Sequence, residues 1–176
     1  LAHFFMEGVY VAACSIGLQS LGSLIFACRS CYFIGNDIGF QADSSPVNGG
    51  YSNLIKFDDC VFQSNTTYHG LLNRGQQIVF QNCDCEGGAT SFRVTSTYED
   101  ETLLSSVTWN NCWWEGNSSN PIIIESSATW VTMRDCNLYG PASSVTINGT
   151  NNHVNLQNCY GTEYLNMADS TGSIEI

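Results

Sequence analysis

Apolar and polar residues alternate in short runs along this chain, and one run returns several times. The clearest copies span residues 55–62, 78–85 and 107–114. In each copy, apolar side chains lie five and three residues before a cysteine, at the cysteine, and two residues after it. Alternation at every second position is typical of a strand with one buried face. Each copy therefore predicts two short strands that meet at a corner.

The regular return of this pattern indicates a repeat protein. Further copies lie at residues 131–138 and 154–159, and two weaker copies lie around Cys31 and Cys14. From Cys31 onward the anchor cysteines are separated by 29, 23, 29, 24 and 23 residues. The step of 17 residues from Cys14 to Cys31 is shorter, so we expect the regular repeat to begin near residue 24.

The residue just before the anchor cysteine predicts the shape of the corner. In the five clear copies this position holds Asp59, Asn82, Asn111, Asp135 and Asn158. Asn and Asp tolerate the left-handed backbone that a sharp corner needs, and stacked amides can hydrogen-bond from coil to coil. The cysteines then point inward as a ladder of reduced thiols, because an unpaired Cys behaves as a compact apolar residue.

A third short apolar strand follows in each copy, at residues 40–42, 92–94, 122–124, 145–147 and 165–167. Three strands per coil predict an all-β fold, a right-handed single-stranded parallel β-helix of about six to seven coils. Leucine-rich repeats would require a repeated Leu, and propeller blades would require longer periods. We expect one domain over residues 1–176, with residues 1–23 as an irregular or first-coil region, and a chain truncated at both ends.

The unit apolar-x-apolar-x-Asn-Cys at residues 154–159 resembles the second strand, asparagine corner and third strand of pectate-lyase-like β-helices. The resemblance covers most of the chain and concerns the fold, because that fold carries lyases, glycosidases, esterases, adhesins and viral spikes. A composition rich in Ser, Thr, Asn and Gly and poor in Lys is most similar to bacteriophage tailspikes. Such proteins are typically homotrimers that bind, and often cut, polysaccharide of the host surface.

Charge and cysteine spacing exclude several classes of partner. The net charge of −11 opposes binding to nucleic acid and to anionic membranes. No apolar run approaches the roughly 20 residues that span a bilayer. The pairs Cys28/Cys31 and Cys83/Cys85 are spaced like metal ligands, but the repeat explains all four as core positions. We therefore expect no nucleic acid, no membrane insertion, no metal and no cofactor.

Outward positions of the predicted coils contain the candidate site. Equivalent residues of adjacent coils lie about 4.8 Å apart, so Glu86 and Glu115 share a column with Gln63 and Tyr139. The neighbouring column holds Val61, Asp84, Trp113, Asn137 and Tyr160. An exposed indole beside carboxylates suits a sugar, with an apolar ring face for the pyranose and oxygens for its hydroxyls. Glu86 and Glu115 are the candidate catalytic pair, and ordinary solvated charges or contacts within a trimer are the alternative.

Several other polar residues and segments are secondary candidates for ligand contact. Arg93 is the one candidate base for a lyase and a candidate substrate contact, together with Asp84, Trp113 and Tyr139. The histidines His69 and His153 are expected at the surface. The long segments 35–53 and 95–106, which include an acidic run at residues 99–101, are expected to add ligand contacts.

The sequence favours a tailspike or fibre segment of a virion that binds, and is a candidate to depolymerise, cell-surface polysaccharide of the host. A homotrimer located in the virion tail or outside the cell is expected from the same resemblance. Two alternatives stay open: a free extracellular polysaccharide lyase or glycoside hydrolase, and a non-enzymatic structural or adhesive β-helix.

Overall fold

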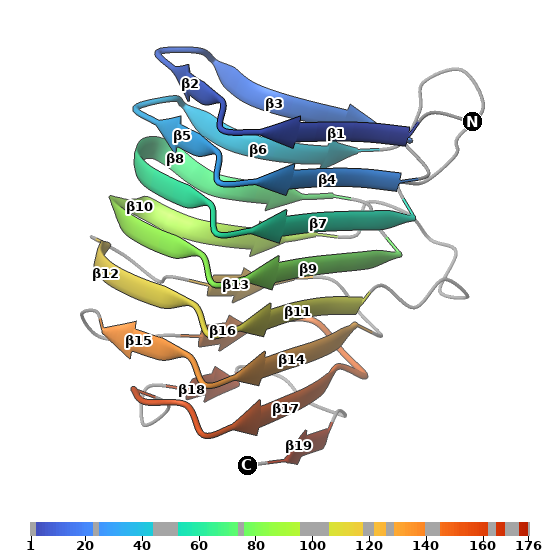
Figure 1. The fold of residues 1–176 in the computed structure, drawn as a ribbon. Coiled ribbons are helices and arrows are strands. Elements are labelled where there is room, and N and C mark those ends of the chain that lie inside the picture. Colours follow the sequence, from blue (N-terminus) through green and yellow to red (C-terminus); the bar gives the residue numbers. More distant parts are fainter. Residues whose placement is uncertain are drawn as a thin grey trace.

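The computed structural model describes residues 3–22, 25–43, 53–73, 76–95, 106–117, 122–125, 129–139, 145–161, 165–167 and 173–175. These residues form strands and connecting turns without any helix. All strand pairs among them are parallel. The chain winds coil upon coil into a rod, with the N- and C-termini at opposite ends (Figure 1). The predicted parallel all-β fold is confirmed.

The first strand of every coil joins one sheet that runs along the rod. In order, its members are β1 (His3–Glu7), β4 (Ile25–Arg29), β7 (Leu54–Asp58), β9 (Gln77–Gln81), β11 (Ser106–Asn110), β14 (Trp130–Arg134), β17 (His153–Gln157) and β19 (Ser173–Glu175). We call it the first sheet. Its eight strands correspond to seven coils and the start of an eighth.

The remaining eleven strands belong to one sheet that bends into two faces, here called the second and third sheets. The second sheet contains β2 (Tyr10–Ala12), β5 (Tyr32–Ile34), the first part of β8 (Val61–Leu72), the first part of β10 (Asp84–Val94), β12 (Trp113–Asn117) and β15 (Asn137–Tyr139). The third sheet contains β3 (Ile16–Leu21), β6 (Ile38–Asp43), the later parts of β8 and β10, β13 (Ile122–Ile124), β16 (Val145–Ile147) and β18 (Leu165–Met167). In the coils of β8 and β10, the second and third strands are one continuous strand.

The corners between the first and second sheets have the predicted left-handed backbone. At Asp59, Asn82, Asn111, Asp135 and Asn158, φ lies between 50° and 53°. The Asn111 amide donates to Asn82 Oδ1 over 2.9 Å, and the Asn158 amide donates to Asp135 Oδ1 over 2.6 Å. Side chains at these corners therefore link neighbouring coils, as the repeat predicts.

The prediction that Cys14 anchors the first coil is wrong. β2 pairs with β5 so that Tyr10 lies opposite Tyr32, which gives the anchor position to Val9. Gly8, with φ of 64°, takes the place of the corner Asn or Asp. Glycine adopts this conformation without steric cost, and valine is apolar like the cysteine it replaces. Residues 3–22 therefore form a regular coil, and the repeat begins earlier than residue 24.

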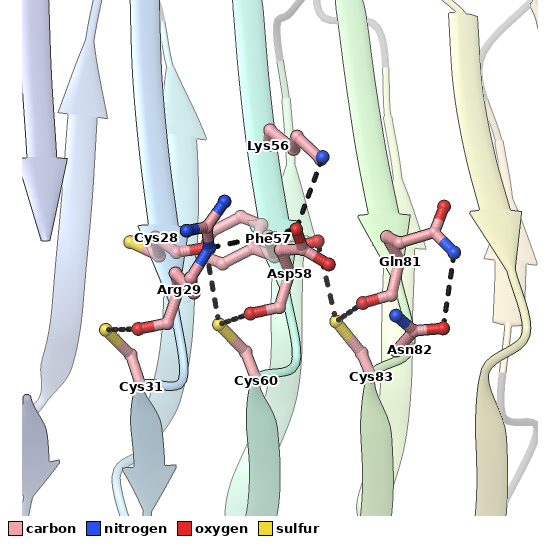
Figure 2. A network of polar contacts seen from close by, with 10 residues as sticks. All are labelled: Cys28, Arg29, Cys31, Lys56, Phe57, Asp58, Cys60, Gln81, Asn82 and Cys83. Carbon is pink, nitrogen blue, oxygen red and sulfur yellow. Dashed lines mark hydrogen bonds and ion pairs between the residues drawn. The ribbon is translucent and has the colours of Figure 1, made fainter. Parts of the chain in front are cut away.

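The anchor cysteines act as hydrogen-bond donors as well as core residues. The thiol of Cys60 donates to the carbonyl of Asp58 over 3.4 Å and approaches the carbonyl of Cys28 in the preceding coil at 3.6 Å. Cys83 repeats both contacts with Gln81 and Phe57 at 3.4 and 3.7 Å (Figure 2). Cys112 and Cys136 make the same two contacts, so these four anchor thiols each contact a carbonyl at their own corner and another in the preceding coil.

A second left-handed residue lies at the corner between the second and third sheets in the first five coils. This position holds Ala13, Gly35, Ser64, Gly87 and Gly116, with φ between 53° and 68°. In three of these coils the next residue is an inward-pointing Asn, and Asn36, Asn65 and Asn117 are buried there. The Asn36 amide donates to Asn65 Oδ1 over 3.2 Å. The interior of the rod therefore contains a polar ladder beside the cysteine ladder.

The prediction that His69 lies at the surface is also wrong. Its ring is fully buried, and its Nδ1 accepts a hydrogen bond of 3.0 Å from the Asn65 amide. Gly88 leaves the space for this ring, because a Cβ there would lie 3.1 Å from His69 Cε1. The imidazole thus fills the space beside Gly88, at the position where the next coil has no inward Asn. Burial lowers the pKa of His69 to about 4, and Asn117 opposes the change.

Aromatic side chains stack from coil to coil in the centre of the core. The ring centroids of Phe57 and Phe80 lie 5.2 Å apart, and those of Phe80 and Trp109 lie 5.7 Å apart, both with interplanar angles of 7°. The ring centroid of Phe92, on the third sheet, lies 4.6 Å from that of Phe80. Stacked aromatic pairs contribute about 0.5–1.5 kcal/mol each beyond their buried area. Stacked rings therefore run without interruption through the coils of β7, β9 and β11.

The cysteine ladder predicts a fixed pattern of thiol reactivity. All nine cysteines are free; seven are buried, Cys14 is exposed and Cys159 is partly exposed. Burial raises the pKa of the Cys83 and Cys85 thiols and keeps them protonated and unreactive. We expect Ellman's reagent to modify Cys14 quickly and Cys159 slowly in the native protein, and nine thiols in denaturant. Fewer than nine thiols in the unfolded, non-reduced protein would reveal disulfides and contradict the ladder.

The buried imidazole predicts a loss of stability in mild acid. The unfolded chain binds the His69 proton near pH 6.5, whereas the folded chain binds it only near pH 4. Protons therefore favour the unfolded state between these values, and stability falls as pH decreases through this window. From pH 7.5 to 5.0 we expect the wild type to lose about 2 kcal/mol more unfolding free energy than His69→Gln in urea titrations. Equal losses in the two proteins would contradict a neutral buried imidazole.

Candidate functional site

Two columns of outward side chains follow the second sheet along the rod. The first, here called the aromatic column, consists of Tyr10, Tyr32, Val61, Asp84, Trp113, Asn137 and Tyr160. The second, here called the carboxylate column, consists of Ala12, Ile34, Gln63, Glu86, Glu115 and Tyr139. The register predicted from the sequence for residues 61–160 of these columns is confirmed. Adjacent members lie about 4.8 Å apart.

Three carboxyl groups, here called the carboxyl cluster, meet in the middle of the two columns. They belong to Asp84, Glu86 and Glu115, and Glu86 and Glu115 are direct register partners. The Gln63 amide donates to Glu86 Oε2 over 3.0 Å, and the Trp113 indole N–H donates to Glu115 Oε2 over 3.2 Å. Both glutamates therefore have a neutral donor that orients the carboxylate.

An open depression of about 340 Å³ lies beside the carboxyl cluster. Gln63, Ser64, Glu86, Gly87, Glu115 and Gly116 line it. Two of these residues are left-handed corner glycines, so bare backbone forms part of the surface between the glutamates and the next face. Glycine at such a point permits close approach of a ligand.

The surroundings of Asp84 change the proton affinity of its carboxyl group. Its pKa is raised to about 6, first by burial and then by the carboxylate of Glu86, with a smaller effect of Glu115. An ordinary Asp carboxyl titrates near 3.9. Near pH 6 Asp84 therefore holds a proton about half of the time, while it lies beside two further carboxyl groups. A carboxyl group in this state can act as a general acid.

Exposed aromatic rings lie on both sides of the carboxyl cluster. Toward the C-terminus these are Trp113, Tyr139 and Tyr160, with exposed fractions between 45% and 70%. Toward the N-terminus, Tyr10 and Tyr32 continue the aromatic column, with ring centroids 6.4 Å apart. The sequence did not place Tyr10 in this column because the first coil lacks an anchor cysteine, whereas Tyr32 directly follows the anchor Cys31 and belongs to the column by the same count. Their position one residue after the corner unit would have identified them.

Arg93 lies apart from the other predicted site residues. It belongs to the part of β10 in the third sheet, where it is the register partner of Leu71 and Ile123. Its guanidinium contacts Glu125 at 2.6 Å and donates to the Tyr68 hydroxyl over 2.9 Å. The candidate base is thus engaged on another face of the rod. Asp84, Trp113 and Tyr139 do lie with the glutamates.

A smaller pocket lies on the first sheet near the C-terminal end. Its volume is about 90 Å³, and Trp130 and His153 are among the residues that line it. Their rings are stacked, with centroids 4.3 Å apart. His153 Nδ1 and the Ser173 hydroxyl share a hydrogen bond of 2.8 Å. His153 thus lies at the surface of the first sheet, as expected, and is half-buried against an indole.

Some of the predicted features lie outside the described residues. Of the segment expected to be a long insertion at 35–53, residues 38–43 form β6, and 44–52 lie outside the described part, as does the acidic run at 99–101. Within the described ranges, no helix is long and apolar enough to cross a membrane. Nor do three or more His, Cys, Asp or Glu side chains gather there in a way that suits a metal ion.

Comparison with known proteins agrees with this architecture. No curated protein and no solved structure matches the chain. A family model described as the right handed beta helix region matches residues 6–160. The matched range contains both columns and nearly the whole rod. The chain therefore belongs to the right-handed β-helix family.

Proposed function

We propose that this β-helix binds a polysaccharide along its second sheet and hydrolyses a glycosidic bond at the carboxyl cluster. The observation that carries the proposal is the carboxyl cluster itself. Asp84, with a pKa raised to about 6, lies beside two register-paired glutamates on an open face that also presents Trp113. Glycoside hydrolysis uses such a pair, in which one carboxyl group keeps its proton and another is ionised.

The roles of the three acids follow from their surroundings. Asp84 is the proton donor, and its proton passes to the glycosidic oxygen as the bond from that oxygen to the anomeric carbon breaks. Glu115 is the most exposed of the three, and its carboxylate forms the bond to the anomeric carbon. Water then displaces this ester while Asp84 takes back a proton. Glu86, held by Gln63, keeps the pKa of Asp84 high.

The stereochemical outcome follows from the role of Glu115, and not from the spacing of the coils. Retaining glycosidases have carboxyl groups about 5–5.5 Å apart, and inverting enzymes leave a wider gap for water. Glu86 and Glu115 are register partners, whereas Asp84 pairs with Trp113 and lies diagonal to Glu115, so the backbones of Asp84 and Glu115 are further apart than the roughly 4.8 Å between register partners. If Glu115 forms the ester, the product keeps the anomeric configuration of the substrate.

The setting that we propose is a receptor-binding spike or fibre of a virion, a homotrimer that meets polysaccharide on the host surface. The composition supports this setting, because the chain is rich in Asn, Ser, Thr and Gly and contains only five Lys and Arg residues. A rigid rod with its polar columns on one side also suits contact with a long polymer. A polysaccharide-cleaving enzyme secreted without a virion would use the same face in the same way.

Removal of single carboxyl groups tests the hydrolysis. Purified protein is incubated with capsular or O-antigen polysaccharide, and new reducing ends are measured. We expect Asp84→Asn and Glu115→Gln each to lower the rate about 10²–10⁴-fold. Glu7→Gln, which changes an exposed carboxylate on the first sheet, is the matched control and should keep wild-type activity. Unchanged release by both site variants, with folding intact, would exclude the carboxyl cluster as the catalytic site.

The pH profile tests the role of Asp84. Because a general acid must be protonated, kcat/KM should fall about tenfold per pH unit above the pKa of about 6. Glu86→Gln removes one of the two negative charges that raise this pKa, so its alkaline limb should move to lower pH. An alkaline limb that does not move in Glu86→Gln would contradict the assignment of Asp84 as the acid.

A further inference from the structure

The aromatic column extends over seven coils, well beyond the carboxyl cluster. Six intervals of about 4.8 Å give a length of roughly 29 Å from Tyr10 to Tyr160. Exposed rings lie toward both ends of the column, and Asp84 lies at its middle. A surface of this length accommodates several sugar rings on each side of a cleaved bond.

The direction of a bound chain follows from where these rings repeat. Strands of the second sheet are short, and β2, β5 and β15 have three residues each. A chain laid across the sheet would meet two outward side chains and then a corner. Along the rod, in contrast, outward positions repeat at every coil, with Tyr32 two coils before Asp84 and Trp113 one coil after it.

The charge of this face is entirely of one sign. The strand segments of the second sheet contain Asp84, Glu86 and Glu115 and no Lys or Arg. The nearest guanidinium along β10, that of Arg93, is paired with Glu125 on the third sheet. Arg29 and Lys56 lie on the first sheet around Asp58, at 4.0 and 3.4 Å from its carboxylate.

An anionic sugar on this face would meet carboxylates without a compensating cation. Two like charges 4 Å apart repel by about 1 kcal/mol in water and about 4 kcal/mol near a protein surface. Uronate, sialate, sulfate or phosphate groups at the cluster would therefore weaken binding substantially. The hydroxyls of a neutral sugar, in contrast, can donate hydrogen bonds to the same carboxylates.

We propose that the substrate is a polysaccharide whose sugars carry no anionic groups at the cleaved linkage, and that it lies parallel to the rod with Tyr32 and Tyr10 as a stacking platform on the N-terminal side. This inference rests on the proposed function and adds to it the charge class, the direction and a second set of contacts. It assigns a binding role to two tyrosines that are remote from the carboxyl cluster.

A panel of bacterial surface polysaccharides tests the charge class, each acidic polymer being paired with its carboxyl-reduced form. Binding of the full chain is measured by affinity electrophoresis. We expect uncharged polymers among the ligands, with affinities that change less than about twofold between 50 and 500 mM NaCl. Acidic polymers should be bound only after carboxyl reduction. Tighter binding of any acidic polymer than of its reduced form would overturn the charge class and leave the proposed function standing.

Tyrosine variants test the direction on the polymer that binds best. Tyr32→Ala should weaken binding about five- to tenfold, and Tyr32→Phe, which keeps the ring, should stay within twofold of the wild type. Trp130→Ala removes an equally exposed ring from the first sheet and should leave binding unchanged. Wild-type affinity of Tyr32→Ala, or a loss confined to Trp130→Ala, would overturn the platform. If no polymer is bound in either form, the proposed function fails and this inference fails with it.

Discussion

The outside of this rod depends on one constraint, the left-handed corner between the first and second sheets. Since the corner has the same length in every coil, residues at equal offsets from it become register partners. One extra residue would turn every following side chain of that strand to the opposite face. Constant corners therefore keep outward side chains in straight columns, whatever the length of the connections elsewhere in the coil.

This constraint also explains what the sequence could predict. The position of each outward residue is counted from the cysteine of its own coil. The register of the two columns around Glu86 and Glu115 therefore follows from the sequence, even though the number of residues per coil varies. The count failed in the first coil, because Gly8 and Val9 preserve the geometry without the cysteine that marks the later corners. Different residue types adopt the same corner conformation there, so a search for a repeated sequence motif does not detect it.

The interior ladder and the separation of Arg93 required spatial information that periodicity lacks. Alternation predicts whether a side chain points in or out, but it does not distinguish the three faces of a coil. β10 continues past its corner, so Arg93 is outward yet on a different sheet from Glu86. The pairs Gly35-Asn36 and Gly116-Asn117, four and five residues after the anchor, were the available signal for the second corner.

Stacking that aligns the columns also forces like charges together. The register partners Glu86 and Glu115 repel, and the half-buried Asp84 adds to the strain. Hydrogen bonds from Gln63 and Trp113, and a proton on Asp84, offset part of this repulsion. The arrangement therefore costs stability in these coils, as is common where carboxyl groups have perturbed proton affinities.

Gly88 connects the inside of the rod to its outside. A side chain at this position would collide with the backbone oxygen of Asn65 and the ring of His69, while Glu86 is only two residues away on the same strand. Any enlargement there would displace the backbone that spaces the carboxylates. The two surfaces of β10 are thus unable to vary independently, and a change in the buried ladder of this coil is also a change in the geometry of the outward carboxyl cluster.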